Sequence, residues 1–131
     1  MHAPIDPEGI CAPTSHYHHA LFVEPGAAWM MLSGQMGQRR DGSCPERMTE
    51  QSELAWQNVL AILSERGLGI ENVVKVTSYI VGEENIDDYV EVHGRVVGVH
   101  RPPWTLVVVP ALGRPQFKVE VDVTAAGPAS R

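Results

Sequence analysis

Apolar residues gather in five short runs whose length and β-branched content are typical of strands. The runs predict strands at residues 20–23, 29–33, 73–81, 105–109 and 117–124. In the last run, valines alternate with Lys118, Glu120 and Asp122, so one face is apolar and the other is charged. The first two runs flank a Glu-Pro-Gly turn, and together they predict a β-hairpin.

Two further segments have the 3.6-residue periodicity of amphipathic helices. The first has a continuous face of small and apolar residues: Ser52, Ala55, Trp56, Val59, Ile62 and Leu63. Thr49 is the expected N-cap of this helix, and Gly67 is expected to follow its last turn. The second helix is predicted from Asn85, as its N-cap, to Val97, with Gly98 after its end.

The predicted order is strand, strand, helix, strand, helix, strand, strand. This order indicates an α+β fold in which two helices pack on one face of a mixed sheet. The chain has 131 residues, of which 44% are hydrophobic and 20% are charged, as is usual for one globular domain. The second face of the sheet mixes polar and apolar residues, including Lys75, Thr77 and Tyr79. We therefore expect another subunit to cover it.

The charge balance disfavours a nucleic-acid partner. Ten Lys and Arg residues against sixteen Asp and Glu residues give a net charge of −6, whereas a phosphate backbone is usually bound by a basic face. No stretch approaches the ~18 apolar residues that cross a bilayer, so no membrane partner is expected. Because the chain has only Cys11 and Cys44 and shows no export signal, we expect free thiols and a cytoplasmic location.

Histidines cluster near the N-terminus. On an extended segment His16 and His18 point the same way, and two imidazoles can share a metal ion. No motif such as H-E-x-x-H adds ligands at a metal-binding spacing, so the pattern favours a cleft rim or a solvated cluster over a metal site. A histidine here can also act directly on a substrate. We predict neither a metal nor a cofactor.

Five stretches resemble, in the same order, motifs of the RidA/YjgF family, which is also called the endoribonuclease L-PSP family. They are SHYHHA at residues 15–20, LSGQ at 32–35, QNVLAIL with a later glycine at 57–67, VVKVTSYI at 73–80 and KVEVD at 118–122. The family's counterparts are GPYSQA, VSGQ, LxNVxAILxxxG, VVKTTVFL and KVEIE. On this basis we divide the chain into an arm at residues 1–12, a RidA-like domain at 13–126 and a tail at 127–131.

The resemblance implies a fold like that of chorismate mutase of the trimeric type, assembled as a homotrimer with a ligand cleft at each subunit interface. It also implies cofactor-independent hydrolysis of imines or enamines, such as 2-iminopropanoate, to a carbonyl compound and ammonia. In the family, an arginine in the segment P-x-R-S binds the substrate carboxylate through paired hydrogen bonds. The matching segment here is Pro-Pro-Trp-Thr, and Trp104 stands at the arginine position.

An indole can stack on a ring or an apolar group and can donate one N–H, but it cannot neutralise a carboxylate. The chain therefore resembles a branch of the family that lacks the arginine, and we expect inefficient turnover of simple 2-iminoacids. Arg101 and Arg114 are the nearest arginines along the chain. The sequence leaves open whether either of them replaces the missing side chain.

The positions that match the family's motifs give each candidate site residue an implied role. Glu120 is the expected acid–base group that orients or activates water, and Tyr17 is expected to hydrogen-bond substrate or water. Ser33 and Gly34 are expected to line the same cleft, where a bare backbone lets a small ligand approach closely.

Four further residues are expected to bind substrate. Trp104 would stack against it, and its neighbour Thr105 would lie in the same cleft. His93 stands where relatives often carry a polar asparagine, and it can exchange a proton near neutral pH. His16, in the histidine cluster, would supply a polar function that the tryptophan does not.

Three classes of function compete. A small-molecule deaminase or hydrolase is preferred because Glu120 and Tyr17 are both present. A noncatalytic metabolite-binding trimer is the alternative, and Trp104 favours it. A ribonuclease or translation inhibitor, the activity behind the older family name, is disfavoured by the acidic charge.

Overall fold

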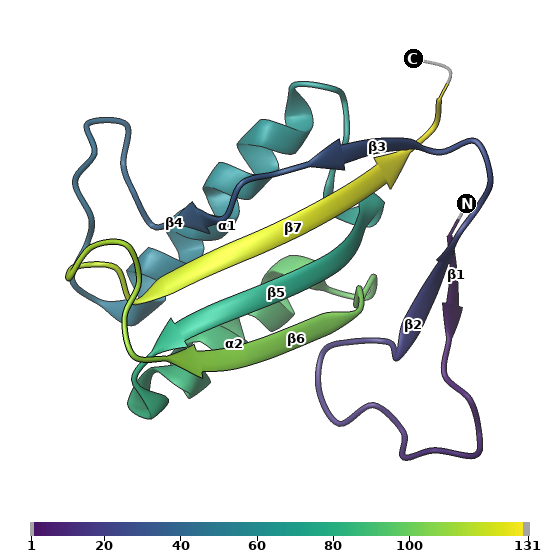
Figure 1. The fold of residues 1–131 in the computed structure, drawn as a ribbon, viewed down its shortest axis with the longest axis horizontal. Coiled ribbons are helices and arrows are strands. Elements are labelled where there is room, and N and C mark those ends of the chain that lie inside the picture. Colours follow the sequence, from purple (N-terminus) through teal and green to yellow (C-terminus); the bar gives the residue numbers. More distant parts are fainter. Residues whose placement is uncertain (1, 130–131) are drawn as a thin grey trace.

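The computed structural model describes residues 2–129 and places two helices against one face of a five-stranded mixed sheet (Figure 1). In chain order the elements are β1 (His2–Ile5), β2 (Ala20–Val23), β3 (Ala28–Met31), β4 (Gln35–Met36), α1 (Met48–Ser64), β5 (Val73–Val81), α2 (Ile86–Val97), β6 (Trp104–Val109) and β7 (Val119–Gly127). The predicted α+β architecture is confirmed. No helix within this range is long and apolar enough to cross a membrane.

Strands β5 and β7 form the centre of the sheet, whose order is β3-β7-β5-β6, with the short β4 also paired to β7. Strand β6 runs parallel to β5, and β7 runs antiparallel to β3, β4 and β5. The antiparallel register places Tyr79 opposite Glu120 and Thr77 opposite Asp122. Directly paired residues share a face, so these four side chains lie together on the side away from the helices.

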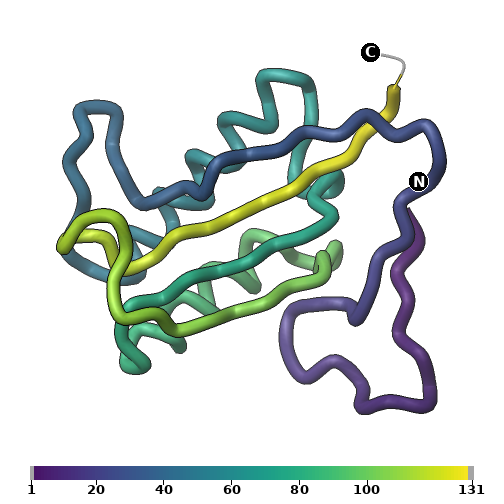
Figure 2. Tube along the Cα trace, in the orientation of Figure 1, coloured from purple at the N-terminus to yellow at the C-terminus, as the bar shows by residue number. Residues whose placement is uncertain are grey.

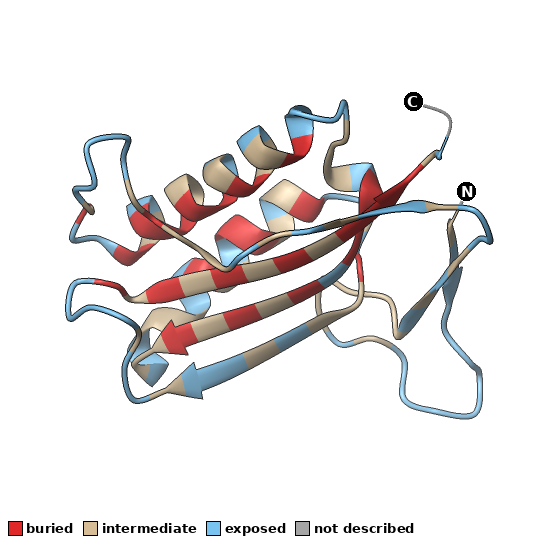
Figure 3. Ribbon diagram, turned by 45° about the horizontal axis from the view of Figure 1, so that its top comes forward, coloured by how far each residue is buried: buried red, intermediate tan, exposed pale blue. Residues whose placement is uncertain are grey.

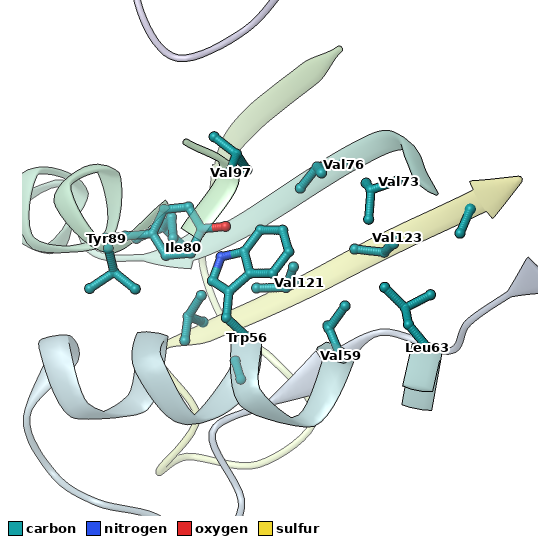
Figure 4. Close-up of a cluster of buried hydrophobic side chains, with 14 of the residues drawn as sticks. Trp56, Val59, Leu63, Val73, Val76, Ile80, Tyr89, Val97, Val121 and Val123 are labelled. Atoms are coloured by element: carbon teal, nitrogen blue, oxygen red, sulfur yellow. The ribbon is translucent and has the colours of Figure 1, made fainter. Parts of the chain in front are cut away.

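The hydrophobic core lies between the sheet and the two helices. Val119, Val121 and Val123 are buried there, as the alternation predicts, and Figure 3 shows the resulting stripes along the central strands. From α1, Trp56 extends into the middle of this layer toward Tyr89 of α2 (Figure 4). Removing this apolar surface from water is the dominant stabilising contribution to such a domain.

Both helices form where the periodicity predicts them. Gly67 and Gly98, at φ +70° and +53°, follow their ends as expected, because glycine adopts a positive φ without steric cost. The predicted N-cap of the first helix is wrong. Helix α1 begins at Met48, after Arg47, and no side chain caps it, so Thr49 lies inside the first turn.

The predicted β-hairpin between residues 20–23 and 29–33 is wrong. Strand β2 pairs with β1, and β3 pairs with the second half of β7, from Ala28 opposite Gly127 to Met31 opposite Thr124. After β2 the chain turns at Gly26, at φ +83°, and then enters the main sheet (Figure 1). Strand β7 is long enough to pair with both β4 and β3, which leaves β2 to pair with the N-terminal segment.

The sheet face opposite the helices is not covered by any other layer of the described chain (Figure 3). Trp29, Met31 and Val107 are exposed on this face, by 58%, 72% and 38% of their surface. Thr77 and Thr105 lie among them, opposite each other in the β5–β6 register. The face is therefore mixed in polarity, as predicted, and it exposes several large apolar side chains.

Candidate functional site

A groove of about 490 Å³ lies on the open sheet face, where β7 begins and β6 ends. Its lining residues are Leu32, Gly34, Tyr79, Val109, Ala111, Leu112, Glu120 and Asp122. The polar side chains of the groove are thus two carboxylates and one phenol, set among apolar side chains. No lysine or arginine of residues 2–129 lines it, so the groove carries negative charge.

Glu120 and Gly34 touch in this groove. Strand β4 runs antiparallel to β7 with Met36 opposite Glu120, which brings the residue before β4 against the glutamate side chain. A Cβ on Gly34 would overlap the Glu120 carboxylate, so a glycine is needed for this approach. None of the ion pairs in residues 2–129 involves Glu120. Its carboxylate is therefore free to meet a small ligand or water.

Tyr17 and His16 lie on the loop between β1 and β2, at the end of the sheet where β6 begins. The backbone N–H of His18 donates a 2.8 Å hydrogen bond to the carbonyl of Arg101, which docks this loop on the segment after α2. The Tyr17 hydroxyl accepts a 3.3 Å hydrogen bond from the backbone N–H of Thr14. Both predicted residues are half-buried, and their side chains belong to the loop rather than to the groove.

The Trp104 side chain points into the helix layer. Its indole stacks on the His93 ring, with centroids 3.8 Å apart and planes 15° apart. Its Nε1–H donates a 2.9 Å hydrogen bond to Ser78 Oγ, and the Ser78 hydroxyl shares a 2.5 Å hydrogen bond with that of Tyr89. The four side chains form a linked polar and aromatic cluster between β5, β6 and α2.

Burial controls ionisation in this cluster. Loss of solvent raises the pKa of Tyr89 and lowers the pKa of His93 to about 3, so both side chains are neutral at pH 7. His93 has no exposed surface, and its Nε2 has no hydrogen-bond partner within residues 2–129. Substrate contact by His93 and Trp104 stays a prediction, and in this subunit both side chains are engaged in internal packing.

Thr105 and Ser33 are both exposed. Thr105 faces the open side of the sheet, opposite in direction to Trp104, and its hydroxyl accepts a 2.9 Å hydrogen bond from Lys75 Nζ. The Ser33 carbonyl accepts a 3.0 Å hydrogen bond from the Gln35 side chain. Both residues remain accessible to a ligand or to a second subunit.

Within one subunit the predicted site residues fall into two groups. The groove brings together Glu120 and Gly34, whereas a second group surrounds the start of β6: His16, Tyr17, His93 and Trp104. Along the strands the two groups lie about 10 Å apart, because Trp104 is level with Val76 and Glu120 with Tyr79, three residues further along β5, at ~3.3 Å per residue. The sheet also separates them, since the Trp104 side chain points toward the helices and the Glu120 side chain points away from them. A single chain therefore does not assemble the whole predicted cleft.

Two groove residues, Asp122 and Tyr79, are not predicted from the sequence as site residues. Asp122 could have been predicted from the alternation over residues 117–124, because this pattern places it on the same face as Glu120. Tyr79 joins the groove through the β5–β7 register, which no residue pattern in either strand specifies.

The N-terminal histidines make contacts other than metal ligation. His18 Nδ1 donates a 2.6 Å hydrogen bond to Asp6, and the His19 backbone N–H donates one of 2.7 Å to the same carboxylate. These contacts lower the pKa of Asp6. Across residues 2–129, no group of three or more His, Cys, Asp or Glu side chains is placed to hold a metal ion. Cys11 and Cys44 are both free, as expected.

This architecture, a mixed sheet with two helices on one face, is that of the YjgF-family structures. The structure of YyfB from Yersinia pestis, described as a protein of unknown function of the conserved Rid family, superposes with a TM-score of 0.84. The match covers 95% of this chain and 97% of that chain at 19% sequence identity, and it shows likeness of fold alone.

Sequence comparison places the chain more closely. The family described as Endoribonuclease L-PSP matches residues 10–127. The RutC family protein YjgH of Escherichia coli K12 is 31% identical over 94 residues, which are 70% of this chain and 72% of that protein. A RutC family protein of Aquifex aeolicus is 35% identical over 82 residues, 62% of this chain and 63% of that protein. The chain belongs to the RidA/YjgF/L-PSP family, whose members are also called RutC family proteins.

Proposed function

We propose that the protein is a cofactor-independent deaminase or hydrolase that adds water to an imine, an enamine or a related small metabolite. The observation that carries the proposal is the groove at the start of β7, where the Glu120 carboxylate lies against the bare backbone of Gly34. The groove volume of about 490 Å³ suits a small metabolite. A cytoplasmic location, supported by the two free cysteines, is part of this proposal.

Glu120 is the proposed acid–base group. It accepts a proton from water while the water oxygen bonds to the carbon of the C=N group, and the proton passes to the nitrogen. The product of this step is a carbinolamine. Glu120 then passes the proton of its hydroxyl group to the nitrogen as the C–N bond breaks, so that imine and water become a carbonyl compound and ammonia. Asp122 and Tyr79 line the same groove and supply further polar atoms for the attacking water and the leaving nitrogen.

We propose that a homotrimer completes the cleft. Tyr17 and His16 lie near the start of β6, away from Glu120, which is level with Val107. A neighbouring subunit would bring its own copies of both residues to the groove. The exposed Trp29 and Met31 on the open sheet face support this assembly. Thr105 and Ser33, both exposed, would lie at the boundary between the subunits.

A charged side chain on the open face is expected to break the trimer. Val107→Asp places an unpaired carboxylate on this face, and burying such a charge against another subunit is unfavourable. The variant should sediment at the 14.4 kDa mass of one chain, and the wild type at three times that mass. The matched control is Val99→Asp at a position 97% exposed, which should remain trimeric. A wild-type monomer, or a trimeric Val107→Asp, contradicts the proposed assembly.

The groove favours substrates without a carboxylate. It holds Glu120 and Asp122 but no basic residue of the described chain, so a substrate carboxylate would be repelled. Trp104 stands at the arginine position of the family motif, and Arg101 and Arg114 are exposed and do not line the groove. These features support membership of an arginine-lacking branch with little activity on simple 2-iminoacids.

Ammonia release from 2-iminopropanoate and from its neutral amide, both generated in situ, tests the reaction. We expect kcat/KM to be about tenfold or more higher for the amide, because one unfavourable charge is removed. Glu120→Gln should lower kcat on the amide about 100-fold through loss of the proton acceptor. The control Glu91→Gln, at an exposed carboxylate of α2, should change neither constant. Full activity in Glu120→Gln would assign the proton transfer to another group.

The second candidate is a noncatalytic metabolite-binding trimer. The packing of Trp104 against His93 favours this candidate, because the side chain at the arginine position then stabilises the fold and does not bind the substrate. Ammonia release no faster than the uncatalysed rate with either imine, together with saturable ligand binding, would support this candidate. Ribonuclease activity is the least supported, since the groove and the whole chain are acidic.

A further inference from the structure

Gly94 lies in the interior of α2, where glycine is a poor helix former and alanine would be better. Its backbone is helical, so no left-handed conformation calls for glycine here. The reason is the His16 ring. A Cβ built on Gly94 would lie 2.6 Å from His16 Nε2 and 2.8 Å from two of the ring carbons. The imidazole therefore lies directly over the space that any other residue would fill.

A second contact holds the same loop on the C-terminal side of Tyr17, where the His18 N–H donates a hydrogen bond to the carbonyl of Arg101, just after α2. Tyr17 therefore lies between two contacts, that of His16 with Gly94 of α2 and that of His18 with the segment after this helix. Asp6 binds the His18 ring and closes the loop across its base. Figure 2 shows this segment running outside the sheet at the end where β6 begins.

We infer that Gly94 is a positioning residue: its missing side chain seats His16 and thereby holds the Tyr17 loop at the end of the sheet that a neighbouring groove would meet. The role of Tyr17 in catalysis rests on the proposed function. The position of the loop rests only on the contacts of His16 with Gly94 and of His18 with Arg101. The two parts are therefore tested separately.

Amide hydrogen exchange of His18 reports on loop docking without any substrate. In the wild-type background, Gly94→Ala should speed this exchange about tenfold or more, because the new methyl group displaces the His16 ring. In a His16→Ala background, the same substitution should change the rate less than about twofold, since no ring remains to be displaced. The control Gly113→Ala, whose Cβ would meet nothing within 4 Å, should leave the rate unchanged.

Comparing Gly94→Ala in the wild-type and His16→Ala backgrounds distinguishes a specific contact with the His16 ring from a general effect of the substitution on the helix. Equal acceleration in both backgrounds, or no acceleration in the wild-type background, would overturn the inference. Far-UV circular dichroism confirms that each variant is folded. If the wild type hydrolyses an imine, Gly94→Ala should also lower kcat/KM about tenfold, with recovery toward the His16→Ala value in the double variant. A wild type without turnover contradicts the proposed function, while the exchange rates still decide the inference.

Discussion

Replacing Trp104 with alanine is expected to lower the free energy of unfolding by about 3 kcal/mol, toward the low end for an aromatic side chain because the indole is only partly buried. The substitution removes the stack on His93 and the hydrogen bond to Ser78, and it opens a gap between β6 and α2. Urea denaturation followed by circular dichroism measures the change. Protein concentration is held constant, because subunit association adds to apparent stability.

Two other substitutions show what the indole contributes. Trp104→Phe keeps a ring on His93 but loses the N–H donor and part of the packed ring volume, so it should cost about 2 kcal/mol, less than alanine does. Trp104→Arg introduces the arginine that the resemblance implies at this position, but the position faces the helix layer. We therefore expect it to destabilise the fold about as much as alanine does, without faster hydrolysis of 2-iminopropanoate. A stable Trp104→Arg with raised activity would instead show that position 104 reaches the cleft.

The elements that were predictable are those in which local pattern and burial agree. Alternating valines specify which face of β7 is buried, and the β-branched run at residues 73–81 gives the bounds of β5. The prediction of a β-hairpin was wrong because strand pairing depends on which strand edges are free in the whole sheet. Nothing in residues 20–33 reveals that β7 has an edge for β3, or that residues 2–5 form a strand with β2.

The site was predictable to the extent that it lies on one strand. Glu120 could be placed on the open face from alternation alone, and the same pattern includes Asp122. Tyr79 depends on register, and the seat of His16 on Gly94 depends on a loop docking against a distant helix. The direction of Trp104 is set by its position as first residue of β6, where the strand parity turns it toward Ser78. These are tertiary relations that a residue pattern does not contain.

Acid is expected to destabilise the protein through His93. Its pKa is about 3 in the folded chain because the ring is buried, against about 6.5 for an exposed histidine. Between these values the unfolded state binds a proton that the folded state excludes, so stability falls as pH decreases. The loss is about 1.4 kcal/mol per pH unit below pH 6.5, or about 3 kcal/mol between pH 6.5 and pH 4.

The His93→Phe variant isolates this contribution. Phenylalanine keeps an aromatic ring against Trp104 but does not titrate, and it removes the unpaired Nε2. Carboxylates with a lowered pKa, such as Asp6, also weaken folding in acid, but they do so equally in both proteins. The difference in unfolding free energy between wild type and variant, from urea titrations at pH 7, 5.5 and 4, should therefore change by about 3 kcal/mol in favour of the variant. Parallel pH profiles would mean that His93 stays accessible to protons in the native state, and that α2, β6 and the Tyr17 loop do not close over it.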